Sequence, residues 1–88
     1  MSSSEIVMYV RPYCSDVEHA RDILKRRGVT WSEIDIEQDA DAAAKVRDWN
    51  DGRAPTPTLW IGKTMLVEPG QREIDEALAK EGLTAGAQ

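Results

Sequence analysis

The most constraining feature of the sequence is an uninterrupted apolar run near its N-terminus, Ile-Val-Met-Tyr-Val at residues 6–10. The run contains β-branched residues and ends at Arg11-Pro12. Such a short run predicts a strand that is buried on both faces, because a strand with one face in water alternates apolar and polar residues. A strand of this kind needs helices on both sides of its sheet, so the run predicts an α/β domain.

The segment that follows this strand has the pattern of an amphipathic helix. Its apolar residues recur at helical spacing and form one stripe, namely Val17, Ala20, Ile23 and Leu24. Ser15 and Glu18 are spaced as in a capping box, in which the Ser15 hydroxyl would accept a hydrogen bond from the Glu18 amide. Basic residues 25–27 fall in the last turn and Gly28 suits the position just beyond it, so we expect the helix to end there.

The rest of the chain predicts a second strand and helix, a hairpin and a final helix. Strands are expected within residues 29–36, 58–61 and 65–67. Helices are expected at residues 42–49 and around Ile74, Ala77 and Leu78. Asp39 or Asp41 would cap the first of these helices, and Gly62-Lys63 would form the turn of the hairpin. The order βαβαββα suggests an α/β protein with a thioredoxin-like fold, a mixed four-stranded sheet flanked by helices.

Length and composition narrow the range of functions. The 88 residues fit a single domain spanning 1–88, with an ordered core at about 5–82 and fraying expected at 84–88. The formal net charge of −5 argues against nucleic-acid binding, which needs a basic face. No run is long and apolar enough to span a membrane. Because no signal-peptide pattern is visible, we expect the protein in the reducing cytoplasm.

A single cysteine, Cys14, stands between the predicted first strand and first helix. One cysteine excludes an internal disulfide, and one Cys with one His cannot form a metal site. At a helix start, unpaired amides and the helix dipole favour a thiolate over a thiol. Arg11 would add positive charge, whereas Asp16 would oppose ionisation if it faced the sulfur. Cys14 is therefore interpreted as a reactive thiol, and the alternative is a small buried apolar side chain.

The chain resembles the glutaredoxin family over about residues 5–80. The matching pieces are residues 9–14 (Tyr-Val-Arg-Pro-Tyr-Cys), 20–24 (Ala-Arg-Asp-Ile-Leu), 28–31 (Gly-Val-Thr-Trp), 33–36 (Glu-Ile-Asp-Ile) and 55–62 (Pro-Thr-Pro-Thr-Leu-Trp-Ile-Gly). Segments 50–53 and 67–69 look closest to mycoredoxin and related actinobacterial-type proteins. The resemblance implies a thioredoxin fold and a thiol-disulfide oxidoreductase.

The register of the first helix places Cys14 at the family's nucleophile position. In the family the first cysteine precedes the Ala-Lys-x-Leu-Leu part of helix one by six residues, as Cys14 precedes residues 20–24 here. The motif is therefore Cys14-Ser15-Asp16-Val17, and Val17 stands where a dithiol enzyme has its second cysteine. The resemblance then implies monothiol exchange. The Cys14 thiolate would attack a mixed disulfide between a client protein and a low-molecular-weight thiol, and a second small thiol would regenerate it.

The resemblance also assigns ligand-binding roles. Thr56 would offer its backbone N–H and C=O to the peptide-like part of the small thiol, as an added strand would. Pro57 would be cis and face the cysteine. Arg11 would contact a ligand carboxylate, Arg53 would lie in the ligand-side loop, and Tyr13 would line the approach. The alternatives are an ordinary rigid turn, solvated charges and a Tyr13 that simply packs.

Two departures from the family pattern bear on the identity of the small thiol. Residues 66–71, Leu-Val-Glu-Pro-Gly-Gln, replace the Gly-Gly and acidic residues that bind the far end of glutathione. Asp16 replaces an aromatic residue and would repel an anionic thiol. The expected co-substrate is therefore glutathione or another low-molecular-weight thiol, with no permanently bound cofactor and no metal.

Two other functions stay open from the sequence. Monothiol relatives bridge an iron–sulfur cluster between two subunits, although their Cys-Gly-Phe-Ser motif is missing here. A redox-inactive thioredoxin-fold adaptor would also fit, with residues 15–17 as traces of lost activity. The favoured function is an oxidoreductase whose partners are a small thiol and client proteins with mixed disulfides. It is expected to be a monomer that binds neither nucleic acid nor membrane.

Overall fold

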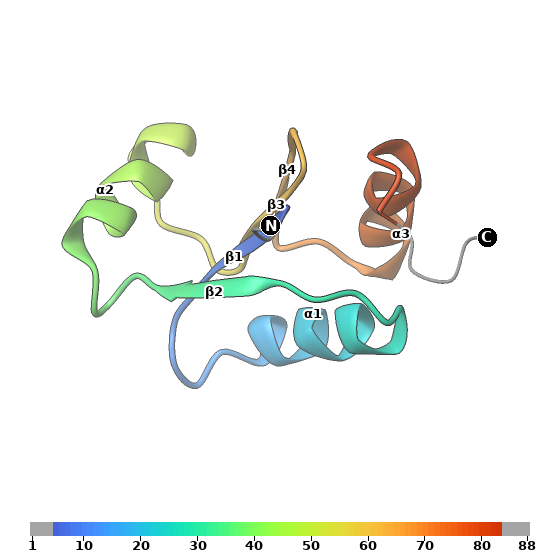
Figure 1. The fold of residues 1–88 in the computed structure, drawn as a ribbon. Helices are drawn as coiled ribbons and strands as arrows, with labels where there is room; N and C mark the ends of the chain where they lie inside the picture. The colour runs from blue at the N-terminus through green and yellow to red at the C-terminus, as the bar shows by residue number, and fades with distance from the viewer. Residues whose placement is uncertain (1–4, 84–88) are drawn as a thin grey trace.

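The strands and helices follow the order expected from the sequence. The computed structural model describes residues 5–83. Along the chain its elements are β1 (Ile6–Val10), α1 (Ser15–Arg26), β2 (Ser32–Asp35), α2 (Ala40–Trp49), β3 (Thr58–Ile61), β4 (Thr64–Val67) and α3 (Gln71–Lys80) (Figure 1). The predicted fraying at 84–88 lies outside the described residues. Within the described part, no helix combines the length and apolar character needed to cross a membrane.

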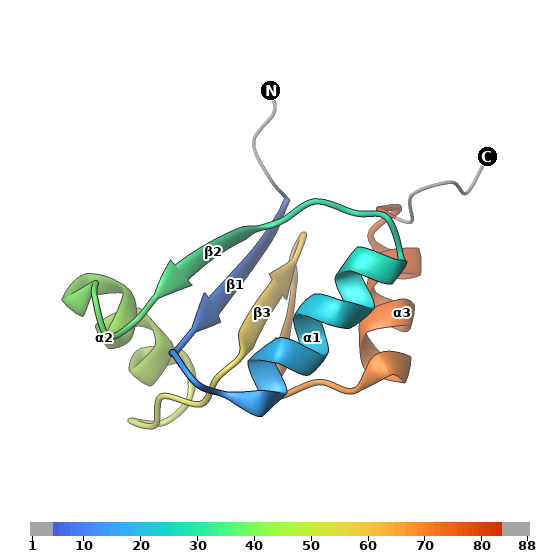
Figure 2. The same cartoon turned by 90° about the horizontal axis from the view of Figure 1, so that it is seen from below.

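Within residues 5–83 the strands form a mixed four-stranded sheet in the order β2-β1-β3-β4. β1 pairs with β2 in parallel and with β3 antiparallel, and β3 pairs antiparallel with β4. Met8 of β1 lies opposite Glu33 on one side and Leu59 on the other. Figure 2 shows β1 between β2 and β3. β1 is thus an inner strand, which explains why its sequence is apolar throughout.

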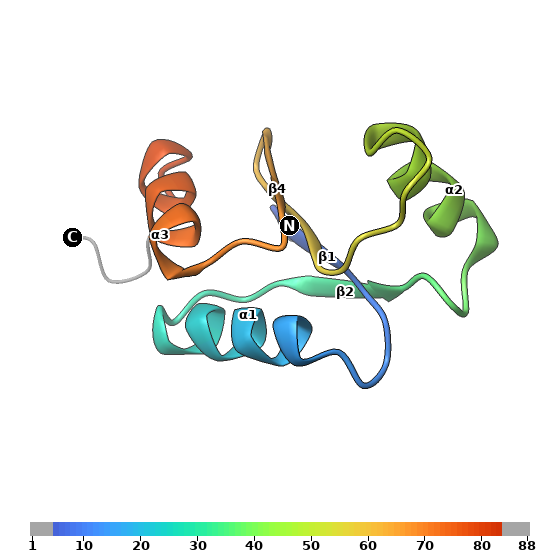
Figure 3. The same cartoon turned by 180° about the vertical axis from the view of Figure 1, so that it is seen from behind.

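The side chains of β1 alternate between two apolar cores. Ile6, Met8 and Val10 face α1 and α3, whereas Val7 and Tyr9 face α2. The first core also contains Val17, Ala20, Ile23, Leu24, Leu59, Ile61, Ile74, Ala77 and Leu78. The second contains Ile36, Ala42, Ala43 and Val46. Figures 1 and 3 show α1 and α3 together on one side of the sheet and α2 on the other. The expected α/β architecture, with helices on both faces, is confirmed.

The apolar stripe of α1 is the predicted one, but its N-terminal cap is not. All four stripe residues are buried. The capping residue is Cys14, whose backbone is extended (φ −109°, ψ 116°), and no side chain caps the helix. Because Ser15 is already helical, its hydroxyl cannot take the capping position, and the predicted Ser15–Glu18 capping box is wrong. The Glu18 amide instead donates to the Cys14 carbonyl at 3.2 Å.

The observed bounds of α2 and β2 differ slightly from the predicted ranges. Asp39, one of the two candidate caps, accepts a hydrogen bond from the Ala42 amide at 3.0 Å. α2 therefore begins at Ala40, earlier than predicted. β2 is shorter than the predicted range because its parallel pairing with β1 begins only at Ser32, opposite Val7.

The three tryptophans lie on α2, on β3 and just before β2. The ring of Trp49 lies edge-on to both Tyr9 and Trp60, with centroid distances of 5.3 Å in each case. Edge-to-face contacts of this kind add to the stability gained by burial. Trp31 packs against the first core and donates to the Glu33 carboxylate at 2.9 Å. The tryptophans therefore support the two cores.

Candidate functional site

Cys14 is placed by the end of β1 and the start of α1. As the capping residue of α1 it lies where the first-turn amides of the helix have no partners within the helix. Its side chain is half-buried and packs against the edge of the first core. Figure 2 shows that the start of α1 and the loop before β3 lie at the same end of the sheet. The sulfur is thus held by a strand, a helix and the edge of the core.

The loop before β3 brings Thr56 against the Cys14 sulfur. The Thr56 hydroxyl donates to Sγ at 3.5 Å, and the thiol donates to the Thr56 carbonyl oxygen at 3.7 Å. The Thr56–Pro57 peptide bond is cis, as the resemblance implied. When the thiol ionises, its hydrogen bond to the carbonyl is lost and the hydroxyl still donates to the sulfur. The hydroxyl therefore favours the thiolate and the carbonyl favours the thiol.

Two hydrogen bonds fasten this loop from other directions. The Thr58 hydroxyl donates to the Pro55 carbonyl at 3.0 Å, and the Glu68 amide donates to the Pro57 carbonyl at 2.9 Å. Thr56 and Pro57 are both buried. In the described part of the chain, the Thr56 amide donates to no protein acceptor. The backbone beside Cys14 therefore has a free donor on a fixed loop.

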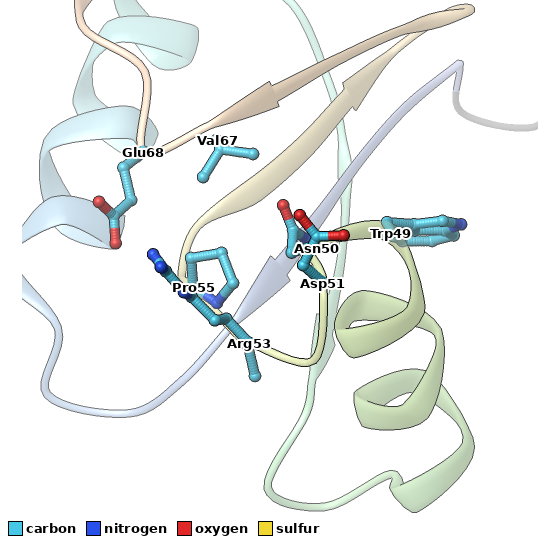
Figure 4. A pocket seen from close by; sticks show the side chains of 8 residues that line it. Trp49, Asn50, Asp51, Arg53, Pro55, Val67 and Glu68 are labelled. Carbon is cyan, nitrogen blue, oxygen red and sulfur yellow. The ribbon is translucent and has the colours of Figure 1, made fainter.

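A pocket of about 690 Å³ lies beside the same loop. It is lined by Trp49, Asn50, Asp51, Arg53, Ala54, Pro55, Val67 and Glu68. Figure 4 shows the Arg53 and Glu68 side chains pointing toward one another at this pocket. The segments 50–53 and 67–69 stand out in the sequence by resemblance, but only the fold shows that they share a pocket. Cys14 is not among the lining residues, so the pocket adjoins the sulfur's surroundings without enclosing the sulfur.

Arg11 and Tyr13 are the other two residues expected at the site. Among the described residues, neither forms a hydrogen bond with Cys14 as Thr56 does. Arg11 forms an ion pair with Glu37 at 3.4 Å, and both side chains are partly exposed. Sequence reasoning missed Glu37, because its position beside Arg11 depends on the parallel pairing of β1 with β2. Tyr13 is fully exposed and its backbone is left-handed (φ 59°), which is an outlier for a bulky residue. Tyr13 does not pack against the protein, so that alternative is wrong.

Two ion pairs with paired hydrogen bonds join neighbouring elements, and neither includes Cys14. The Arg21 guanidinium binds both carboxylate oxygens of Glu33 at 2.8 and 2.7 Å, joining α1 to β2. Arg27 binds Asp75 in the same way at 2.6 and 2.9 Å, joining the end of α1 to α3. These hydrogen bonds lower the pKa of Glu33 and the pKa of Asp75 from their ordinary values. Their role is therefore to position the helices.

The chain is similar to one known protein family and to several solved structures. The glutaredoxin family model matches residues 6–66. A mutant of the thioredoxin-like protein BC3987 has a similar structure, with a TM-score of 0.76 and 23% identity over 88% of this chain and 97% of that one. Glutaredoxin from Archaeoglobus fulgidus gives a TM-score of 0.74 and 22% identity over 88% of each chain.

A third similar structure is the glutaredoxin from Brucella melitensis, with a TM-score of 0.67 and 25% identity over 100% of this chain and 97% of that one. No curated protein sequence matches the chain. The family model covers more than half of the 88 residues, and the structural neighbours share the thioredoxin-like fold seen here. The chain therefore belongs to the glutaredoxin family.

Proposed function

We propose that the protein is a thiol-disulfide oxidoreductase that acts by monothiol exchange through Cys14. The observation that carries the proposal is the position of the Cys14 sulfur, at the start of α1 and within hydrogen-bond distance of the Thr56 hydroxyl and carbonyl. The helix start and the hydroxyl both stabilise a thiolate. A thiolate is the nucleophile in thiol–disulfide exchange.

The exchange takes place in two steps. In the first, the Cys14 thiolate attacks the small-thiol sulfur of a client's mixed disulfide. The old disulfide bond breaks, and the client leaves as a thiolate that takes up a proton. In the second, the thiolate of another small-thiol molecule attacks the adduct on Cys14, which releases the Cys14 thiolate and a small-molecule disulfide. The net reaction reduces the client disulfide and oxidises two small-thiol molecules to their disulfide.

The single cysteine favours this mechanism over a dithiol one. Cys14 is the only cysteine in the 88 residues, so no internal disulfide can form. Val17, at the position of a second cysteine in dithiol enzymes, is buried in the first core. Regeneration must then come from a second small thiol.

The loop and the pocket supply groups that fit a small thiol. The free amide of Thr56 can pair with the peptide-like part of such a ligand, as an added strand would. Arg53 lies in the adjoining pocket, where a ligand carboxylate could be bound. A buckwheat glutaredoxin that resembles this chain (TM-score 0.65, 19% identity) was solved as a glutathione complex. This supports glutathione or another low-molecular-weight thiol as co-substrate. As expected from the sequence, we further propose client proteins with mixed disulfides as partners, and a monomer in the cytoplasm.

The test uses a client peptide joined by a disulfide to glutathione, and the same peptide joined to cysteamine. The reduced protein should release the free peptide and carry the small thiol on Cys14, as seen by mass spectrometry. Cys14→Ser should release no peptide. A folded wild-type protein that releases no peptide from either substrate would refute the proposal. If its Cys14 were also alkylated no faster than free cysteine, the redox-inactive adaptor would be the better interpretation.

A further inference from the structure

The end of the sheet that carries Cys14 is rich in carboxylates. β1 and β2 run parallel, so the segments that follow them lie at the same end of the sheet. The segment after β1 leads to Cys14. Residues 35–41, at the end of β2 and beyond it, contain four acidic residues and no basic one. Asp16, exposed in the first turn of α1, adds a carboxylate on the cysteine's own helix.

The positive charge on this side is already neutralised. Arg11, three residues before Cys14, forms an ion pair with Glu37 at 3.4 Å. Within residues 5–83, Asp16 forms no ion pair. The nearest charged residues to Cys14 along the chain are therefore a neutralised arginine and an unpaired carboxylate.

The other side of the cis-proline loop is also acidic. The hydrogen bond from the Glu68 amide to the Pro57 carbonyl brings the end of β4 against this loop. Glu68 is exposed, and its carboxylate stands at the pocket with Arg53 pointing toward it (Figure 4). Asp51 lines the same pocket. The charged residues of the pocket are thus one cation and two anions.

The start of α3 has a carboxylate close to its first backbone amides. The Gly70 amide there donates to the Glu73 carboxylate at 2.7 Å, so this donor is already used by an acidic side chain. An anionic ligand group at this helix start would therefore lie near the Glu73 carboxylate.

We propose that Cys14 reacts preferentially with disulfides whose small thiol carries no net negative charge, a preference that rests on the exchange function proposed above. The unpaired carboxylate of Asp16 lies on the cysteine's own helix, Glu68 follows the strand bonded to the cis-proline loop, and Arg11 is neutralised by Glu37, so an anionic thiol is repelled. A neutral thiol is not repelled, and a cationic one is attracted. The bond changes are those of exchange. Cys14 Sγ bonds to the small-thiol sulfur, and the departing sulfur leaves as a thiolate that takes up a proton.

The test compares three symmetrical disulfides of similar size. Cystamine is cationic, hydroxyethyl disulfide is neutral and dithiodipropionate is anionic. The rate at which each forms an adduct on Cys14 is measured by mass spectrometry and divided by its rate with a neutral free thiol, N-acetylcysteine amide, which removes differences in intrinsic reactivity. At about 0.01 M ionic strength, where charges interact over about 30 Å, the normalised rates should fall in the order cationic, neutral, anionic. At about 1 M salt, where the range is about 3 Å, they should converge.

Variants that remove one carboxylate each test which residues cause the charge preference. Asp16→Asn and Glu68→Gln should each reduce the cationic-to-anionic rate ratio about twofold at low salt, because each removes one carboxylate near the sulfur. Glu5→Gln is the matched control. Glu5 is exposed and precedes β1, so it lies at the opposite end of that strand from Cys14, and its removal should leave the ratio unchanged.

The outcomes separate this inference from the exchange function. Equal normalised rates for the three disulfides at low salt, or a fastest rate for the anionic one, would overturn the charge preference and leave exchange intact. A Cys14 that formed no adduct with any of the three would refute the exchange function and the preference together.

Discussion

Removing the hydroxyl of Thr56 tests whether this group holds the Cys14 sulfur as a thiolate. Thr56→Val keeps the shape of the side chain and removes the donor, which lies 3.5 Å from Sγ. A hydrogen bond to a charged group contributes about 1.5–3 kcal/mol. At this distance, and with Cys14 half-exposed, we take the lower end, about 1.5 kcal/mol, as the stabilisation of a charged sulfur that the variant loses, which is roughly a factor of ten.

The change in reaction rate should be smaller than this factor of ten. A more basic thiolate is a better nucleophile, with a Brønsted slope of about 0.4–0.5, so roughly threefold of the tenfold loss is recovered. Thr56→Val should therefore be alkylated by iodoacetamide about three- to fourfold more slowly than the wild type at pH ~6. The rate is followed by the intact mass of the protein, and circular dichroism confirms that the variant is folded.

Two further variants serve as controls. Thr56→Ser keeps the hydroxyl and should react at the wild-type rate. Thr58→Val removes a hydroxyl that donates to the Pro55 carbonyl at 3.0 Å, not to the sulfur, and should also react at the wild-type rate. If Thr56→Val reacted as fast as the wild type, the hydroxyl would not be stabilising the thiolate and the reasoning would be refuted.

Three more predictions concern stability. Leu24→Ala, at a fully buried position of the first core, should lower the free energy of unfolding by about 2–5 kcal/mol, measured by urea unfolding with tryptophan fluorescence. Asp39→Ala should lower the free energy of unfolding by about 1 kcal/mol, because the α2 cap is lost. Asp41→Ala removes no cap and should lower it by only about a few tenths of a kcal/mol. Equal losses for the two variants would contradict the role of Asp39 as the cap. Because Arg27 lowers the pKa of Asp75 from its ordinary value of 3.8, the pair stabilises the fold above that pH and loses the effect as pH falls below it. The stability gap between wild type and Asp75→Asn, measured by urea unfolding, should therefore shrink in acid, and a gap that grew in acid would contradict this sign.

The helices and strands could be predicted because their signals are local. The stripe of α1 and the inner strand β1 follow from apolar spacing within a few residues, and packing then buried the same side chains. The cap of α1 was predicted wrongly. The Ser15–Glu18 spacing suggests Ser15 as the capping residue, but α1 already begins at Ser15, so the capping position falls to Cys14. Local patterns of this kind fix an element more firmly than its ends.

The site was predictable only in part, because its contacts join distant parts of the chain. Cys14 stood out by its place before a helix, but its contact with Thr56, 42 residues later, was implied by family resemblance alone. The pairing of Arg11 with Glu37 depends on which strand lies beside β1, and neither residue's neighbours in the sequence specify that. Ion pairs and pockets formed by residues far apart in the sequence were therefore seen only in the three-dimensional structure.

The hydrogen bonds around residues 55–58 have a consequence for ligand binding. This short loop is tied to the start of α1 through Cys14, to the end of β4 through Glu68, and to itself through Thr58. A ligand that pairs with the Thr56 amide therefore meets a preorganised edge, and little backbone entropy is lost when it binds. Affinity for even a small ligand can then come from few contacts.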